Sequence, residues 1–169
     1  MKDVMTFWMD KGVDGFRIDA VNFLFEDDRF MDEPLSGIPG VNPNSSAYLN
    51  HIYTKDQNGT LDMIYQWREH MDEYTEAHGG DARIFMTESY TDIKTTMLYY
   101  GLPDGSRLGA HFTFNFFYIT NVNNNSNAQD FVDIIDTWYE NMPDFSPRRY
   151  NSTLVRTRIA LSYERVTII

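Results

Sequence analysis

The chain has 169 residues, 42% of them hydrophobic and 15% aromatic, and a formal net charge of −11. This composition supports a packed core and argues against disorder. An acidic surface repels phosphate backbones, so a nucleic-acid partner is disfavoured. We expect no membrane span and no signal peptide within the chain, because it lacks an apolar run of ~20 residues and its first residues alternate charged and apolar side chains.

The first half of the chain predicts a helix, a strand, a long loop and a second helix. Apolar residues at helical spacing place the first helix over 2–11, and a short strand follows at 15–19. The connection over about 26–60 is rich in Asp, Pro, Asn, Ser and Gly. Loops of that length inside a compact domain usually have a function. The second helix is predicted from about Thr60 to His78.

The second half predicts two strands and two helices. A buried strand is expected at 83–87 and a short helix at 92–100. Residues 109–116 alternate between phenylalanine-rich and polar positions, which predicts a strand of period two. The last helix begins with the apparent capping box of Ser126 and Gln129, and Pro143 stops it.

Strands and helices therefore alternate along the chain. This order predicts an α/β fold with parallel strands joined by helical crossovers. Only three strands are evident, whereas a complete barrel of eight strands needs about 250 residues. The sequence thus predicts a segment of a larger sheet.

Two carboxylates stand at the ends of predicted strands. Asp19 ends the first strand and Glu88 directly follows the second. Functional groups collect at the C-terminal ends of parallel strands. Neighbouring strands are ~4.8 Å apart, so the two carboxylates can approach the separation of about 5–5.5 Å that retaining glycosidases use. This placement favours Asp19 as nucleophile and Glu88 as general acid/base.

The neighbours of the two carboxylates suit these separate roles. Arg17 lies two residues before Asp19, on the same face of the strand, and should hold it ionised and oriented. Glu88 needs a drier setting that keeps it protonated. Tyr90 and the phenylalanines of the third strand are candidates to supply it.

Structural interpretations remain open for the same residues. Asp19 could be a salt-bridge partner of Arg17 or a helix cap, and Glu88 could face solvent, because acidic residues at strand ends are common. A core histidine satisfied by a backbone carbonyl is the first interpretation of His111. The four histidines show no metal-ligand spacing. The acidic run over 26–33 lacks the pattern of a calcium loop, so a solvated face is predicted there.

Asparagine sequons point to a secretory parent protein. They begin at Asn44, Asn58, Asn124 and Asn151, all in stretches rich in turn residues. Chance in an Asn-rich chain is the alternative for any single site. Cysteine is absent, which excludes disulfides and thiol nucleophiles within the chain.

Several motifs together resemble one family. Asp14-Gly-Phe-Arg-Ile-Asp-Ala20 resembles the nucleophile segment of glycoside hydrolase family 13, the α-amylase family. Six further stretches resemble the insect maltase (α-glucosidase) branch: 24–26, 32–37, 51–55, 65–68, 86–90 and 109–112. The resemblance covers roughly residues 1–143. It implies a fragment of a (β/α)₈ TIM barrel containing about three central strands with their helices.

The resemblance also implies residue roles. Asp19 matches the family nucleophile, Glu88 the acid/base and Arg17 the supporting arginine. Ala20 matches the small residue of members that prefer α-1,4 linkages, whereas valine there accompanies α-1,6 preference. His111 falls near the mouth of the family's pocket, as a candidate substrate contact. The implied substrate is a disaccharide or short oligosaccharide and the implied cofactor is none, although the complete family fold allows a structural calcium ion.

The chain departs from the family in two segments. An early Asp-x-x-x-Asn-His segment and a later His-Asp pair, whose Asp stabilises the transition state, are both missing. Residues 144–169 form a divergent tail with 5 Arg and 2 acidic residues, against 9 basic and 23 acidic residues in 1–143. We therefore expect little or no hydrolysis by this chain alone.

Two other functions stay open. One is the non-enzymatic barrel domain of an amino-acid-transporter heavy chain, and the other is a degenerate fragment without activity. The intact Arg17, Asp19 and Glu88 favour an enzyme over the heavy chain. A secreted or extracellular-facing parent protein is expected both for the enzyme and for the heavy chain.

Overall fold

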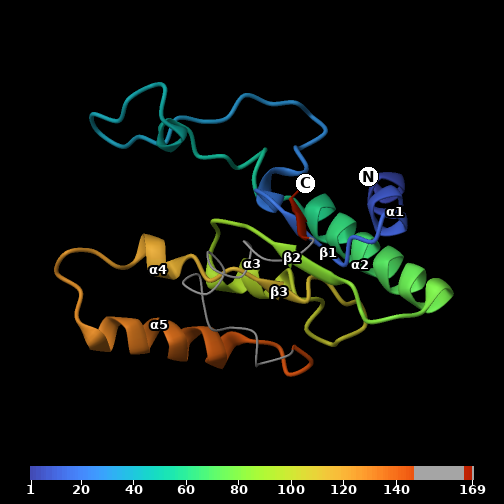
Figure 1. The fold of residues 1–169 in the computed structure, drawn as a ribbon. Coiled ribbons are helices and arrows are strands. Elements are labelled where there is room, and N and C mark those ends of the chain that lie inside the picture. The colour runs from blue at the N-terminus through green and yellow to red at the C-terminus, as the bar shows by residue number, and fades with distance from the viewer. Residues whose placement is uncertain (147–165, 169) are drawn as a thin grey trace.

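A parallel sheet of four strands forms the centre of the computed structural model, which describes residues 1–146 and 166–168 (Figure 1). The strands are β1 (Gly15–Ile18), β2 (Ile84–Thr87), β3 (Phe112–Thr113) and β4 (Val166–Ile168). Their order across the sheet is β3-β2-β1-β4, and every pairing is parallel. The predicted α/β class is therefore confirmed, with one strand more than the sequence suggested.

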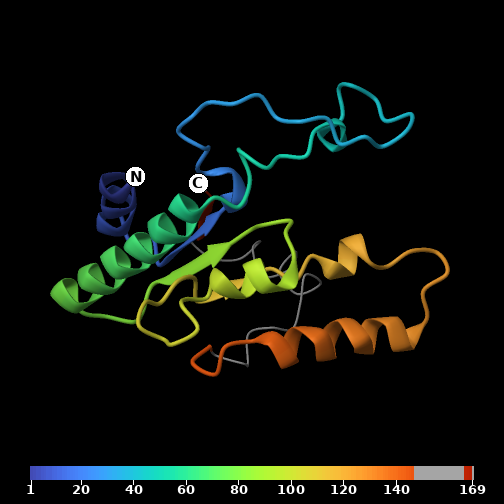
Figure 2. The same cartoon turned by 180° about the vertical axis from the view of Figure 1, so that it is seen from behind.

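Helices flank this sheet. The longer ones are α1 (Lys2–Asp10), α2 (Asn58–His78) and α5 (Ala128–Asn141), and the shorter ones are α3 (Ile93–Leu98) and α4 (Phe117–Thr120). Figures 1 and 2 show α1 and α2 together near β1, whereas α4 and α5 lie near each other beyond β3. The long predicted loop is confirmed: it holds the 3₁₀ turn η2 (Ser46–Tyr48) and one isolated antiparallel bridge between Leu35 and Leu49, and it extends away from the sheet.

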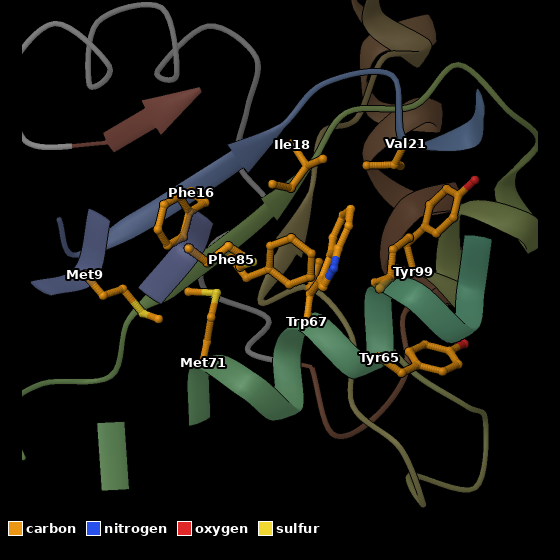
Figure 3. Packing of buried hydrophobic residues seen from close by; sticks show 12 residues of the cluster. Met9, Phe16, Ile18, Val21, Tyr65, Trp67, Met71, Phe85 and Tyr99 are labelled. Carbon is orange, nitrogen blue, oxygen red and sulfur yellow. The ribbon is translucent and has the colours of Figure 1, made fainter. Parts of the chain in front are cut away.

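The main core lies between the sheet and the helices α1 and α2. Phe16 of β1 and Phe85 of β2 are fully buried and face Met71 of α2 (Figure 3). The ring of Trp67 meets that of Phe85 edge-on at 6.4 Å between centroids. Each such buried side chain stabilises the fold by roughly 1.5–3 kcal/mol. Because side chains alternate along a strand, this packing sends Arg17 to the other face.

That other face is aromatic. Met86, Phe114 and Phe116 form a second buried cluster there, against which Ile84 and Phe112 pack. The guanidinium carbon of Arg17 lies 5.4 Å from the centre of the Phe114 ring. Arg17 thus sits between an apolar wall and the C-terminal edge of the sheet.

The strand predicted over 109–116 is wrong in length, since β3 has only two residues. After Thr113 the chain turns: the side-chain oxygen of Asn115 accepts a hydrogen bond from the backbone N–H of Phe117, at 3.1 Å, and α4 begins there. The alternation was misleading because both faces of this segment are buried. Asn115 is 5% exposed, although it belongs to the polar set.

The capping box predicted at Ser126 and Gln129 is displaced by one residue. Asn127 is the N-cap of α5, and the Asp130 carboxylate accepts from its backbone N–H at 2.6 Å. Ser126 is engaged one turn earlier, where its hydroxyl accepts from the backbone N–H of Asn123.

Candidate active site

The two predicted carboxylates leave the sheet side by side. Ile18 pairs with Thr87 in the register of β1 and β2, so Asp19 and Glu88 are the next residues on neighbouring strands. Backbone bonds continue the ladder: the Glu88 N–H donates to the carbonyl of Ile18 at 2.9 Å, and the Val21 N–H donates to the carbonyl of Glu88 at 3.0 Å. The main-chain bonds therefore place the two residues side by side at the ends of their strands.

Arg17 joins the two carboxylates through one nitrogen. Its Nη2 lies 2.9 Å from Oδ1 of Asp19 and 2.9 Å from Oε2 of Glu88. The two oxygens are thus separated by no more than twice that distance, which suits the gap of about 5–5.5 Å in retaining glycosidases. The bonds from an ionised donor are also strong and directional.

The environments of the two acids differ. The side chain of Asp19 is 43% exposed and that of Glu88 is 19% exposed. Burial raises the pKa of Glu88, a hydrogen bond with Asp19 raises it further, and the charge of Arg17 opposes both. The net shift is upward, so Glu88 holds a proton more readily than an ordinary glutamate. That is the property a general acid needs.

Aromatic rings border the site. Tyr90 stacks on Phe116 with ring centroids 4.4 Å apart and an angle of 6° between the planes. Phe114, which supports the guanidinium of Arg17, is stacked on Phe116 in turn. The sequence prediction named Tyr90 but did not single out Phe114. The period-two pattern of 110–116 was the signal that would have placed Phe114 on this face.

Ala20 occupies a strained backbone conformation directly beside Asp19. Its φ is 48° and its ψ is 40°, in the left-handed region, and it is the N-cap of the 3₁₀ turn η1 (Val21–Phe23). Left-handed geometry is uncommon for residues with a Cβ and tends to occur at functional sites. Here it turns the chain sharply after Asp19, whose side chain stays exposed.

His111 is not brought to the carboxylates. Its Nδ1 accepts from the backbone N–H of Phe85 at 3.0 Å, and Phe85 lies three residues, about 10 Å along an extended strand, before Glu88. Burial, and to a lesser degree the charge of Arg68, lower the pKa of His111 to about 4. It is therefore a neutral core histidine bonded to the main chain, as the structural interpretation anticipated, although it accepts a hydrogen bond instead of donating one.

The residues present do not fit the calcium ion that the complete family fold allows. Both oxygens of Glu33 accept hydrogen bonds from the backbone N–H groups of residues 52–54, and Asp27 pairs with Arg29 at 2.7 Å. These carboxylates are already engaged, and no cluster of three metal-ligating side chains occurs among the described residues.

Three of the four sequons lie in described parts of the chain. Asn44 lies in the long loop, Asn58 begins α2 and Asn124 lies between α4 and α5, and all three are exposed. Asn151 lies outside the described residues. Within the part of the chain that the structure covers, no helix has the length and apolar character to cross a membrane.

Comparison with known proteins places this site in a family context. Residues 1–156 match the family described as "Alpha amylase, catalytic domain". The chain is 48% identical to Maltase 1 of Drosophila virilis over 143 residues, which cover 85% of this chain and 22% of that protein. It is 36% identical to the amino acid transporter heavy chain SLC3A1 of Homo sapiens over 149 residues, or 85% of this chain and 21% of that one.

A solved structure agrees with the sequence relatives. The fold superposes on the crystal structure of an alpha-glucosyl transfer enzyme, XgtA, with a TM-score of 0.62 and 27% identity, covering 83% of this chain and 25% of that chain. The fold is thus a fragment of a TIM barrel. The chain spans about a quarter or less of the length of these relatives.

Proposed function

Because the chain belongs to the α-amylase family, we propose that it carries the nucleophile and the acid/base of an α-glucosidase. The complete protein hydrolyses terminal α-1,4-linked glucose from maltose or short malto-oligosaccharides, with retention of configuration. The observation that supports this proposal is the shared contact of Arg17 with Asp19 and Glu88, since it keeps the two acids close enough to act on one glycosidic bond.

The mechanism has two displacements. First, a carboxylate oxygen of Asp19 attacks the anomeric carbon, while Glu88 donates its proton to the departing glycosidic oxygen. The result is a glucosyl ester on Asp19 and a free aglycone hydroxyl. Then Glu88, now a carboxylate, takes a proton from a water molecule whose oxygen attacks the same carbon. Glucose leaves, Asp19 is a carboxylate again and Glu88 is protonated again.

The surroundings of each acid support its role. Asp19 is the more exposed of the two and contacts Arg17, so its carboxylate is oriented and accessible for attack. Glu88 is the more buried, and its raised pKa maintains the proton that the first step requires. The resemblance implies a third carboxylate from a segment that this chain lacks, so activity belongs to the complete protein.

Mechanism-based labelling tests the proposal in the complete protein. A fluorinated α-glucosyl substrate with a good leaving group should form a stable ester on the peptide that contains Asp19, and newly released glucose should be the α-anomer. Asp19→Asn should abolish labelling. Glu88→Ala should slow maltose hydrolysis by about 10²–10⁴-fold. With an activated aryl α-glucoside, whose leaving group departs without a proton, azide should speed turnover of this variant and give the α-glucosyl azide.

A matched control is Asp28→Asn, since Asp28 is an exposed carboxylate of the long loop. It should leave labelling and turnover unchanged. Release of β-glucose, or a label on another residue, would overturn the assignment of Asp19.

The heavy chain is the second candidate, favoured by the 36% identity to a transporter heavy chain. Asp19-dependent labelling separates the two, because a heavy chain needs no glucosyl ester. An extracellular location fits either candidate and is supported by the exposed sequons at Asn44 and Asn124.

A further inference from the structure

Asp56, at the end of the long loop, contacts the segments that follow both carboxylates. Its backbone N–H donates to the carbonyl of Asn22 at 2.8 Å, and its Oδ2 accepts from the hydroxyl of Thr91 at 2.6 Å. Asn22 lies three residues after Asp19, and Thr91 lies three residues after Glu88. One residue therefore bridges the turn that leaves β1 and the turn that leaves β2.

The remaining oxygen of Asp56 is also engaged. The hydroxyl of Tyr99, which is fully buried just after α3, donates to Oδ1 at 2.8 Å. Burial and the charge of Asp56 together raise the pKa of Tyr99, so this hydroxyl keeps its proton and remains a donor. Lys55 lies 3.8 Å from Oδ2 and offsets the negative charge. With both oxygens bonded, Asp56 has a fixed orientation.

Asp56 is itself held by the loop. Its φ of 54° is in the left-handed region, where a residue with a Cβ persists only when its surroundings determine it. Glu33 supplies that constraint. Its carboxylate accepts hydrogen bonds at 2.8 and 2.7 Å from the backbone N–H groups of Tyr53 and Thr54, which lie three and two residues before Asp56. The loop is thus fastened before it reaches Asp56.

We propose that Asp56 is a positioning residue that sets the separation of Asp19 and Glu88 by clamping the turns that follow them. The ladder bonds fix the two acids only at the strand ends, and beyond them the chains diverge into η1 and toward α3. Asp56 links the two diverging segments through its bonds to Asn22 and Thr91. The catalytic consequence rests on the proposed glucosidase function, whereas the clamp itself does not.

Kinetics in the complete protein test the catalytic consequence. Asp56→Asn and Thr91→Val should each lower kcat for maltose by about tenfold or more, since small displacements of reacting groups are expensive, with KM within about twofold. The basic limb of the pH–rate profile should move to lower pH, because a Glu88 that moves away from Asp19 and into solvent loses the causes of its raised pKa. Thr91→Ser, which keeps the hydroxyl, should restore both.

Asp32→Asn provides the matched control, because Asp32 is an exposed carboxylate of the same loop. It should leave kcat and the pH profile unchanged. Variants that lose thermal stability but keep the wild-type kcat and basic limb would reduce Asp56 to a loop anchor and overturn the proposal.

Hydrogen exchange tests the clamp without activity. In Asp56→Asn, peptides that contain the amides of Val21 and Glu88 should exchange about tenfold faster than in the wild type, and in Asp32→Asn they should not. If the wild-type complete protein does not hydrolyse maltose, the proposed function fails, yet faster exchange still supports the clamp. Unchanged exchange at Val21 and Glu88 overturns the clamp, whatever the activity.

Discussion

At the scale of residues, Arg17 contacts both acids and lowers the pKa of Glu88. Its single Nη2 contacts both carboxylates, and its flat guanidinium packs over the Phe114 ring. The positive charge favours the ionised form of Glu88, while burial and Asp19 favour the protonated form. The pKa of Glu88 is therefore the balance of opposing neighbours, and Arg17 is the neighbour that can be removed by substitution.

Replacing Arg17 by methionine should raise the pKa of Glu88 further, because the charge that lowers it most is gone and only the weaker effect of the backbone hydrogen bond from Ala20 still lowers it. If Glu88 is the acid, the basic limb of the kcat/KM profile in the complete protein should move to higher pH, while kcat/KM itself falls by about 10²-fold or more as Asp19 loses its support. The control is Arg29→Met, which removes the exposed arginine that pairs with Asp27. It should leave the basic limb at the same pH. A limb that moves down in Arg17→Met would contradict the assignment.

The sequence predicted part of this site. Asp19, Glu88 and Arg17 could be placed because strand ends and two-residue spacing are local patterns. The bonds of Asp56 could not, since they join residues 35 or more positions apart without any periodic signal. The alternation over 110–116 indicated the face on which Phe114 lies, but not its contact with Arg17. The left-handed conformation of Ala20 was equally invisible, because alanine carries no preference for it.

At the scale of elements, the starts of α1, α2, α3 and α5 were predicted within a residue or two, whereas the short α4 was not predicted and the cap of α5 was displaced. Asp92 caps α3: its Oδ1 accepts from the backbone N–H groups of Lys94 and Thr95 at 2.9 and 3.1 Å. Burial alone would raise the pKa of Asp92, but the bonds from the Thr95 hydroxyl and these N–H groups outweigh it and the pKa is lowered. The strand β3 (Phe112–Thr113) is shorter than predicted for a different reason. The segment alternates apolar and polar residues as a half-exposed strand does, but both of its faces are buried.

Asp92→Ala should lower the free energy of unfolding by about 1 kcal/mol at neutral pH, the usual effect of losing an N-cap. Because the folded-state pKa is lowered, the ionic part of this contribution is present above the pKa of the unfolded state. It is lost as pH falls through the folded-state value. Urea unfolding at pH 7 and near pH 2 measures the difference. Asp92→Asn keeps a capping oxygen, so its effect should be small and nearly independent of pH.

At the scale of the whole molecule, apolar surface remains uncovered on two helices. On α5 only Ile134 and Trp138 are buried, while four other large apolar side chains are exposed: Phe131, Val132, Ile135 and Tyr139. On α1, Phe7 and Trp8 are 54% and 39% exposed. The sequence predicted both helices, but most of the apolar residues that indicated them are exposed, and the buried residues Met5, Met9 and Ile134 were not singled out. Surfaces of this kind favour association.

The isolated chain should therefore self-associate at micromolar concentration, as measured by sedimentation velocity. Replacing Phe131 and Ile135 together by lysine should shift the distribution toward monomer. The pair Gln129→Lys and Thr137→Lys adds the same charge to exposed positions of α5 and leaves the apolar stripe intact. If both pairs dissociate the chain equally, charge repulsion explains the effect and the apolar faces do not.

The left-handed turn at Ala20 also limits which side chains this position accepts. A β-branched residue is a genuine outlier at φ of 48°, and a left-handed conformation costs roughly 1–2 kcal/mol for any residue with a Cβ. An exchange of alanine for valine would thus demand a reshaped main chain as well as a different pocket. The side chain and the main-chain turn at this position are therefore energetically coupled.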